Sequence, residues 1–509
     1  MQWLNKVVDG VVRAHPEGEI LVSSGVSPSG IYHVGTLREV LTADAIMLAL
    51  RARGRDARHI HVVDDLDPLR KIPAGVPDSF EKYFGMPLID VPAPDSKAAS
   101  WADYYFNDFA KSAKKLGLDM EIMRSHKKYR SGFFVPAIEK VLDNLDKARQ
   151  IITDISGRQL DENWSPIQIK ENKYLKSRRF LGIDTQHKTI TYEDKNGAEK
   201  QASYAKGDVK LYWRLDWPAR WWLLGVDVEP FGRDHATKGG SYDTGVGLVK
   251  QIFKDKPPLP VPYNFINRTG QTKKMSKSTG DTLAISDMLE ILPPEVLRFF
   301  VLRYAPDKLL FFDETNSVVK LIDDFAELLA KPDKTAEDQQ LIDISMASVP
   351  QTTISNIPFS HLVASYQAAL KDPERTLEII RRTEHKETVN AQEEVIKQEL
   401  KFIDNWLKNW APEDIKFELA AKPPKVIGEN ERQYLLALAD KIEKAPADAD
   451  GQWFHQAIYE FKDTHNLSPK QLFSVLYTVL IGQEHGPRAG WFLSILPRDW
   501  LIKRLRLEA

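Results

Sequence analysis

The chain has 509 residues, of which 42% are hydrophobic and 28% are charged, the balance of a folded globular protein. Its 70 lysines and arginines almost match 72 aspartates and glutamates, which excludes a surface that is basic throughout but not a local basic path. Cysteine is absent, so disulfides, thiolate nucleophiles, iron–sulfur clusters and cysteine-bound zinc are excluded. Residues 1–15 show neither a sustained apolar core nor a small-residue cleavage site, and no apolar run reaches the ~20 residues that a membrane helix needs. We therefore expect a soluble, cytoplasmic protein of about three domains.

A βαβ unit is predicted near the start of the chain. An apolar run at 19–24 predicts a buried strand, and Gly25 to Gly30 form a loop of turn residues. A helix over 36–53 and a strand over 59–63 follow, and this strand ends in the acidic run 64–67. A strand, loop, helix and strand at this spacing form a right-handed βαβ unit, which favours a nucleotide-binding α/β domain.

The predicted secondary structure of the remaining chain falls into three successive regions. The polar, lysine-rich segment 167–210 predicts small antiparallel hairpins, the α/β pattern then returns with a strand at 261–266, and nearly everything beyond Pro294 reads as helix. We therefore predict a Rossmann-like parallel-sheet domain in two halves, 1–91 and 211–285, split by an inserted module at 92–210. A helical region at 286–345 and an all-α domain at 346–509 complete the chain.

The first motif is His33-Val-Gly-Thr36, where the first loop enters the helix. A helix start exposes unpaired N–H groups, Gly30 and Gly35 allow close backbone approach, and an imidazole donates well to a phosphate oxygen. The alternative is a histidine packed in a loop, with Gly35 serving only the turn. Four residues alone leave both interpretations open.

The second motif is Lys-Lys-Met-Ser-Lys-Ser-Thr-Gly at 273–280, in a polar loop after a predicted strand. Lysines on such a loop neutralise charge that develops on a leaving pyrophosphate. Most lysine runs are simply solvated, but Met275 is unusual among such neighbours. Because both motifs follow strands of one α/β domain, the sequence favours a single ATP site.

Together the two motifs resemble the two signatures of class I aminoacyl-tRNA synthetases, and their flanks resemble the class I lysyl-tRNA synthetases in particular. The resemblance implies a lysine–tRNA ligase that uses ATP and Mg²⁺ and acts on L-lysine and tRNA(Lys). It also implies that 92–210 contacts the acceptor end of tRNA, 286–345 its stem, and 346–509 its anticodon. The stretches that carry the resemblance are 24–40, 64–71, 213–221, 229–235, 239–245, 467–470 and 482–488.

The resemblance also implies the residues of the ATP site. Asp234 would hold the ribose or the substrate amino group, although an aspartate followed by His-Ala-Thr-Lys could instead be a helix N-cap. The implied catalytic residues are His33, Thr36, Lys274 and Lys277, and the implied ATP-binding residues are Gly30, His33, Gly35, Gly232, Asp234, Met275, Ser276 and Lys277.

A lysine pocket must balance a buried ammonium. Trp217 offers a cation–π face, and Asp216 or Glu229 offers a carboxylate. The alternative for Trp217 is a core cluster with Trp213, Trp221 and Trp222 at helix-like spacing. By resemblance, the pocket is lined by Gly25, Ser27, Trp217, His235 and Tyr263.

Two other functions remain open. Glutamyl enzymes share the fold, but their arginine for the substrate carboxylate corresponds here to about Ser23, with Ser24 beside it, and a hydroxyl does not neutralise a buried carboxylate. A non-catalytic tRNA-binding relative is the second alternative. Intact catalytic motifs argue against it.

Expectations about metals and partners complete the analysis. Related archaeal enzymes often carry cysteine zinc ligands in the inserted module; none exists here, so we expect no zinc, no protein-bound metal, and a segment 167–205 held by hairpin packing. We expect a monomer. Candidate tRNA phosphate contacts, each also readable as a solvated face, are Lys127, Lys128 and Arg130, then Lys176, Arg178 and Arg179, and finally Lys503, Arg504 and Arg506.

Overall fold

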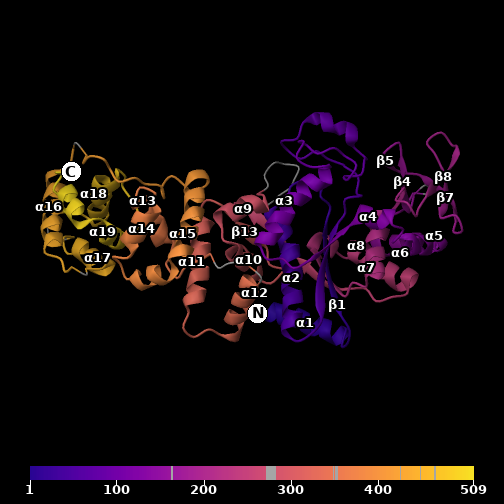
Figure 1. The fold of residues 1–509 in the computed structure, drawn as a ribbon, viewed down its shortest axis with the longest axis horizontal. Coiled ribbons are helices and arrows are strands. Elements are labelled where there is room, and N and C mark those ends of the chain that lie inside the picture. Colours follow the sequence, from indigo (N-terminus) through magenta and orange to yellow (C-terminus); the bar gives the residue numbers. More distant parts are fainter. Residues whose placement is uncertain are drawn as a thin grey trace. The chain divides into compact units, whose positions relative to one another are not determined.

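The computed structural model describes residues 1–161, 164–270, 283–347, 349, 353–424, 426–447, 449–462 and 466–508. The chain divides into two compact units, and each is described by itself. Unit 1 comprises 1–289, 297–312 and 335–350, and unit 2 comprises 290–296, 313–334 and 351–509. Figure 1 labels their elements.

Unit 1 is built on a five-stranded parallel sheet with the strand order β11-β10-β1-β2-β3. Its central strands are buried along almost their whole length, as parallel strands covered on both faces must be. The predicted α/β class and βαβ unit are confirmed. The strands are β1 (Ile20–Val26), β2 (Ala57–Val63), β3 (Glu121–Arg124), β10 (Val228–Gly232) and β11 (Leu259–Tyr263).

Strand β3 lies inside the range 92–210 that the sequence assigns to the inserted module, so the parallel sheet extends into that range. The helical elements of unit 1 before β12 are α1 (Gln2–Ala14), η1 (Val34–Thr36), α2 (Leu37–Ala52), η2 (Asp78–Tyr83), α3 (Trp101–Lys115), α4 (Ser125–Arg130), α5 (Val135–Asp143), α6 (Leu145–Ser156), α7 (Trp213–Leu224), η3 (Arg233–His235), α8 (Ser241–Leu248) and η4 (Val249–Phe253).

The predicted antiparallel hairpins are present as two three-stranded sheets. In the turn after β7, Gly197 has φ +81°, and Asp194 Oδ1 accepts the N–H groups of Asn196 and Ala198. One sheet contains β5 (Tyr174–Ser177), β4 (Ile167–Glu171) and β9 (Val209–Leu211), and the other contains β6 (Arg179–Asp184), β7 (Thr189–Glu193) and β8 (Glu199–Ser203).

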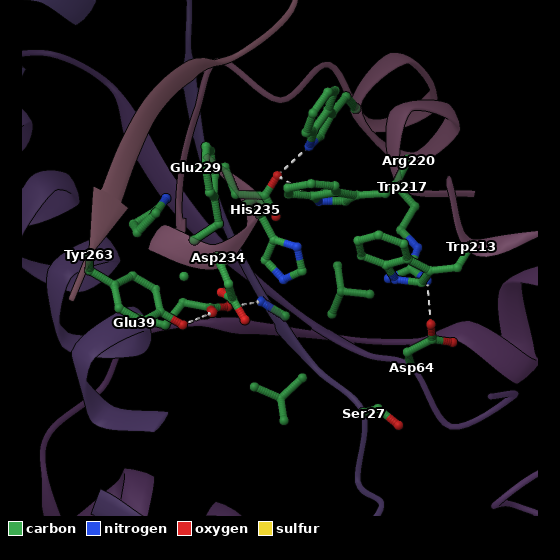
Figure 2. A pocket seen from close by; sticks show the side chains of 18 of the residues that line it. Ser27, Glu39, Asp64, Trp213, Trp217, Arg220, Glu229, Asp234, His235 and Tyr263 are labelled. Atoms are coloured by element: carbon green, nitrogen blue, oxygen red, sulfur yellow. Dashed lines mark hydrogen bonds and ion pairs between the residues drawn. The ribbon is translucent and has the colours of Figure 1, made fainter. Parts of the chain in front are cut away.

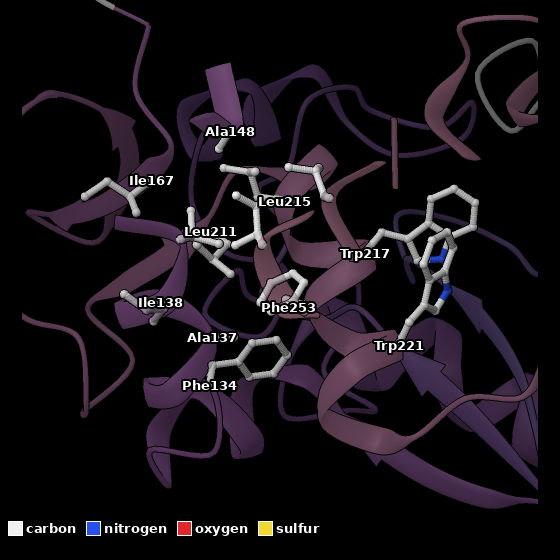
Figure 3. Packing of buried hydrophobic residues seen from close by; sticks show 14 of the residues in the cluster. Phe134, Ala137, Ile138, Ala148, Ile167, Leu211, Leu215, Trp217, Trp221 and Phe253 are labelled. Carbon is white, nitrogen blue, oxygen red and sulfur yellow. The ribbon is translucent and has the colours of Figure 1, made fainter. Parts of the chain in front are cut away.

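A hydrophobic cluster joins these sheets to α5, α6 and α7, and Figure 3 shows Trp217 and Trp221 among its members. The chain then forms β12 (Ile266–Arg268), which pairs in parallel with β13 (Leu310–Phe312). The helices α9 (Ile285–Ile291) and α10 (Pro294–Leu302) each contribute residues to both units, and α12 (Ala336–Met346) belongs to unit 1.

Unit 2 is helical, as predicted for the C-terminal region. Its second half packs around a core that includes Tyr434, Leu476 and Phe492. In the described part of the chain, no helix has the length and apolarity needed to cross a membrane. The helices are α11 (Ser317–Ala330), α13 (Phe359–Ala368), α14 (Pro373–Ile380), α15 (Lys386–Asn409), α16 (Glu429–Glu443), α17 (Gly451–Tyr459), α18 (Pro469–Ile481), α19 (Ala489–Ile495) and α20 (Arg498–Leu505).

Candidate active site

A cavity of about 270 Å³ lies at the carboxyl ends of β1, β2, β10 and β11 (Figure 2). Ligands of open α/β sheets bind at this edge, where strand order reverses around the first strand. The cavity is lined by Ser23, Gly25, Val26, Ser27, Glu39, Val62, Asp64, Asp67, Trp213, Trp217, Arg220, Trp221, Glu229, Pro230, Phe231, Gly232, Asp234, His235, Tyr263 and Phe265.

Glu39 forms one side of this cavity. It follows Thr36 by one helical turn, and its Oε1 accepts the N–H of Gly25 at 2.6 Å while its Oε2 accepts the hydroxyl of Tyr263 at 2.7 Å. Burial, together with the nearby carboxylates Glu229 and Asp234, raises the pKa of Glu39 to about 8 against the hydrogen bonds that lower it. A buried carboxylate with such neighbours favours a positively charged ligand.

Glu229, on β10, is held by neutral donors. Its Oε2 accepts Nε1–H of Trp217 at 3.2 Å and Nε1–H of Trp221, and its Oε1 accepts the hydroxyl of Ser23 at 3.3 Å. Burial raises the pKa of Glu229, although these hydrogen bonds counter the effect. The two indoles are thereby fixed in orientation at the cavity wall.

Asp64 lies on the opposite side in Figure 2 and is paired with cations. Its Oδ2 lies 2.5 Å from Arg220 Nη2 and 3.4 Å from Lys210 Nζ, and Lys210 also lies 3.7 Å from Asp67. Burial alone would raise the pKa of Asp64, but the two cations outweigh it and hold the pKa below its usual range.

Asp216 requires a correction, because it is not among the residues that line the cavity. Its fully buried carboxylate pairs with Arg220 and accepts the hydroxyl of Tyr129. Successive helical residues point about 100° apart, so in α7 Trp217 faces the cavity while Asp216 faces the interior. Asp216 supports Arg220 and does not contact the space where a ligand would lie.

Both interpretations of the tryptophans hold, because Trp217 and Trp221 belong to the buried cluster and also line the cavity. Trp213, Trp217 and Trp221, spaced four apart, form one stripe along the cavity, with ring centroids 5.4 and 4.7 Å apart. Trp222 instead stacks on Phe253 in the core, at 5.0 Å. His235 extends the stripe, 5.5 Å from Trp217.

The first motif lies at the start of α2 outside the lining set. His33 Nδ1 accepts the N–H of Gly35 at 3.0 Å, and a Cβ on Gly35 would lie only 2.7 Å from the imidazole, so any other residue there would displace the His33 ring. Thr36 is nearly buried where η1 meets α2, and Gly30 is buried in the preceding loop.

The predicted residues Lys274, Met275, Ser276 and Lys277 lie outside the described residues. The chain that follows them is described and lies against the first motif. Leu283 O accepts the N–H of Val34 at 3.0 Å, and Ala284 forms a β-bridge with His33. Residues 283 and 284, which follow the second motif in sequence, therefore lie beside the first motif.

Gly232 and Asp234 are brought to the cavity by the end of β10. A Cβ on Gly232 would lie 2.5 Å from Asp234 Oδ1, so any other residue there would displace the Asp234 carboxylate. Asp234 lies within η3, whose N-cap is Gly232, while the N-cap of α8 is Gly240. The N-cap alternative for Asp234 is thus wrong.

The three predicted tRNA-binding clusters are partly occupied by internal ion pairs. Arg178 pairs with Glu171 at 2.6 Å and Arg130 with Asp90 at 3.0 Å. Arg504 is buried at 2% exposure, which corrects its assignment as a phosphate contact. Arg179 and Arg506 also have acidic partners, and the exposed lysines of the three clusters are Lys127, Lys176 and Lys503.

Glu39, Asp64 and Arg220 line the cavity, and none of the three was predicted from the sequence to do so. A signal existed for two of them. Glu39 is an acid within an otherwise apolar predicted helix face, and Asp64 directly follows a predicted parallel strand. Arg220 carried no comparable signal, because only the fold brings it to Asp64.

Comparisons with known proteins agree along the whole chain. A family model described as tRNA synthetases class I (K) matches residues 1–351, and one described as an anticodon binding domain matches 373–508. The lysine–tRNA ligase 1 of Methanosarcina acetivorans is 36% identical over 532 residues, covering 99% of this chain and 98% of that protein. The lysine–tRNA ligase of Pyrococcus horikoshii is 32% identical over 523 residues, covering all of both chains.

A solved structure also aligns along most of the chain. The glutamate–tRNA synthetase of Elizabethkingia anophelis covers 97% of this chain and 100% of its own, at 12% identity and a TM-score of 0.44. A similarity of that size carries no argument about function.

Proposed function

The chain belongs to the class I lysyl-tRNA synthetases, and from that premise we propose that it activates L-lysine with ATP in the cavity and transfers it to the 3′ end of tRNA(Lys). The observation that carries the cavity assignment is the acidic side at Glu39. Among its described hydrogen-bond partners are a backbone N–H and a phenol, and no cation. The ammonium group of a bound lysine supplies the cationic partner that is absent from these contacts of Glu39.

Glu39 is a better partner for the ammonium than Glu229. Both are buried, but Glu229 already accepts hydrogen bonds from two indoles and a hydroxyl. The pKa of Glu39 is about 8 in the free protein, so its ionised form is destabilised there. A cation bound beside Glu39 stabilises that ionised form, and this favours binding of the cation. Trp217 then contacts the aliphatic stem or the cation through its ring face.

The same charges disfavour glutamate as substrate. A second carboxylate in the cavity would face Glu39 and Glu229, while Arg220 is engaged by Asp64 and Asp216. Ser23, where a glutamyl enzyme needs a cation, donates its hydroxyl to Glu229 instead. A buried carboxylate left without a cation is strongly unfavourable.

The reaction has two steps. The carboxylate of lysine attacks the α-phosphate of ATP, forming lysyl-adenylate and releasing pyrophosphate. The terminal ribose hydroxyl of tRNA then attacks the acyl carbon and AMP leaves. Mg²⁺ enters with ATP as part of the substrate, held mainly by phosphate oxygens. Because no covalent enzyme intermediate forms, catalysis consists of positioning and charge stabilisation.

Residue roles follow from these steps. His33 and Thr36, with Gly30 and Gly35, face the phosphates at the start of α2, and Gly232 and Asp234 hold the ribose or the α-amino group. Gly25, Ser27, His235 and Tyr263 complete the lysine pocket. In the second motif, Lys274 and Lys277, with Met275 and Ser276 between them, stabilise the leaving pyrophosphate. The helical unit reads the anticodon, and the enzyme acts as a monomer.

The test is ATP–pyrophosphate exchange with each of the standard amino acids, with and without total tRNA. We expect exchange with lysine alone. Exchange with glutamate would overturn the argument from Ser23 and Glu39. Silence with every amino acid, despite tight tRNA binding, would favour the non-catalytic alternative.

Lys277→Ala separates a catalytic from a binding role. We expect the activation rate to fall about 100-fold or more with tRNA affinity nearly unchanged, since the lost charge acts on the transition state. The control is Lys256→Ala, an exposed lysine on another loop. Equal behaviour of the two variants contradicts the proposed role.

A further inference from the structure

Two histidines and a glutamate converge in the helical unit, far along the chain from the residues that line the active-site cavity. His361 lies in the first turn of α13, and Glu384 and His385 end the turn between α14 and α15. His361 Nδ1 lies 3.0 Å from His385 Nε2, which lies 3.6 Å from Glu384 Oε1. One ligand atom from each residue lies within 4.8 Å of the other two.

The spacing of these atoms suits a small divalent cation. Zinc with bonds of about 2.0–2.1 Å to its ligands separates tetrahedral ligand atoms by roughly 3.3 Å, and the two closest separations here are 3.0 and 3.6 Å. Two imidazoles that face each other share a single proton, whereas a metal ion uses both lone pairs. Two imidazoles with one carboxylate form a donor set for Zn²⁺, while Mg²⁺ and Ca²⁺ prefer oxygen ligands.

Neighbouring groups hold the ring of His361 and the backbone at His385 in position. The His361 ring stacks on Trp491 of α19, with centroids 4.1 Å apart and planes 18° apart. The N–H of His385 bonds Thr383 Oγ1 at 3.2 Å, and Thr383 in turn donates to the carbonyl of Ile380 at the end of α14 at 2.7 Å. The stacked indole thus orients the ring of one proposed ligand, as supporting contacts do at metal sites.

Exposure at the cluster matches a half-buried metal site. The side chain of His385 is 15% exposed and that of Glu384 is 53% exposed. The histidines therefore lie within the helical unit while the glutamate reaches solvent, from which water completes the coordination of a three-ligand site.

We propose that His361, Glu384 and His385 bind one Zn²⁺ ion, with water as the fourth ligand, and thereby join α13 to the turn between α14 and α15. This proposal departs from the prediction of no zinc and no protein-bound metal, which was based on the absence of cysteine ligands and did not consider histidines of the helical unit. The proposal stands whether or not the chain ligates lysine, because it depends only on the helical unit.

A bound ion would restrain His361, a side chain that lines two cavities. His361 lines one of about 230 Å³ and another of about 680 Å³, and both are also lined by Arg488 and Trp491. Because α13 packs against α14, α15 and α19, fixing His361 fixes a side chain that both cavities share. Zinc occupancy therefore stabilises the walls of these cavities.

The first experiment is calorimetric titration of the full-length, tag-free, metal-stripped chain with Zn²⁺. We expect one ion per chain, and we expect His361→Gln and His385→Gln each to weaken binding on the order of 100-fold. The control is His187→Gln, which removes an exposed histidine paired with Asp184 on a hairpin and leaves uptake unchanged. Wild-type chain without stoichiometric uptake, or uptake equal in all variants, overturns the proposal.

A second measurement keeps the proposal testable if a variant folds poorly. Co²⁺ added to the wild-type chain should give the intense visible absorption of a four- or five-coordinate site with nitrogen ligands, and Zn²⁺ should abolish it. Zn²⁺ should also raise the melting temperature of the wild type but not of His385→Gln. A weak octahedral Co²⁺ spectrum indicates an adventitious ion only and refutes the site.

Discussion

Two sides of one cavity carry carboxylates that are equally buried and yet have opposite surroundings. Asp64 lies against Arg220 and Lys210, which hold its pKa low, whereas Glu39 meets Gly25 and Tyr263 and has a pKa of about 8. The side at Asp64 is neutralised by the protein itself, and the side at Glu39 is not. Burial is common to both, so the identity of the partner decides which carboxylate supports the fold and which awaits a ligand.

The largest expected effect is a loss of stability in Arg220→Met, which removes the cation that Asp64 and Asp216 share. Asp216 would lose its cation in the interior and Asp64 would keep only Lys210, at 3.4 Å, and we expect a loss of about 3–5 kcal/mol in the free energy of unfolding. Urea denaturation measures it. The control Arg179→Met removes a surface pair with Glu193 and should leave stability nearly unchanged. Similar curves for the two variants would mean that the side at Asp64 is not held by its cation.

The next largest effect is expected at Glu39, the carboxylate without a cation among its described partners. Glu39→Gln preserves shape and removes charge, so we expect the KM for lysine to rise about 100-fold at pH 8, with kcat less affected. Steady-state aminoacylation at varied lysine measures both constants. Glu229→Gln is the matched variant and should raise KM less, because indoles and a hydroxyl already satisfy Glu229. The reverse order would assign the ammonium to Glu229.

The raised pKa of Glu39 predicts a pH dependence of lysine binding. Below pH 8 the carboxyl is protonated in the free protein, so lysine must displace a proton. We expect affinity to increase up to roughly tenfold per pH unit between about pH 6 and 8 and to level off above. Calorimetry in two buffers of different ionisation enthalpy measures the proton release, and Glu39→Gln should show none.

Stability responds to the same two groups with opposite sign. The folded pKa of Glu39 lies above its usual 4.5, so its contribution to stability is lost as pH rises from there through about 8. The folded pKa of Asp64 lies below its usual 3.8, so its contribution is present above that pH and is lost as pH falls. Urea midpoints across pH, compared between wild type and Glu39→Gln, separate the two.

The smallest effect tests the hydrogen bond at Glu39. Tyr263→Phe removes the 2.7 Å donor to Glu39, which we expect to raise the KM for lysine about fivefold, or about 1 kcal/mol. Because that hydrogen bond lowers the pKa of Glu39, the midpoint of the pH profile should move upward. Tyr242→Phe is the control, since its hydroxyl bonds the carbonyl of Pro258 instead. An unmoved midpoint in Tyr263→Phe contradicts the assignment.

Local patterns in the sequence were sufficient for much of the fold. The alternation of apolar runs, glycine-rich loops and helical spacing predicted β1, α2 and β2 to within a few residues, and also the hairpins after 167 and the helices after 294. These features depend on periodicity and turn residues that lie close together in the chain. The motif around His33 could be identified for the same reason, because its residues are consecutive in the chain.

Errors arose where a side chain's direction depended on packing. Asp216 and Trp217 are neighbours in sequence, and only the rotation of α7 against the sheet shows that Trp217 reaches the cavity while Asp216 does not. Arg504 sits in a run of basic residues that reads as a surface, yet it is buried in α20. Composition and spacing do not reveal how a helix is rotated about its axis.

By itself, then, the sequence determined the α/β class with its helical C-terminal region, the two motifs and the family they resemble, because each is written in residues that are near one another. The tertiary structure alone decided which buried charge meets which partner. Glu39 and Tyr263 are 224 positions apart, and Asp64 and Arg220 are 156 apart. The pKa of a buried carboxylate depends on atoms within a few ångströms, and only the folded chain brings those atoms together.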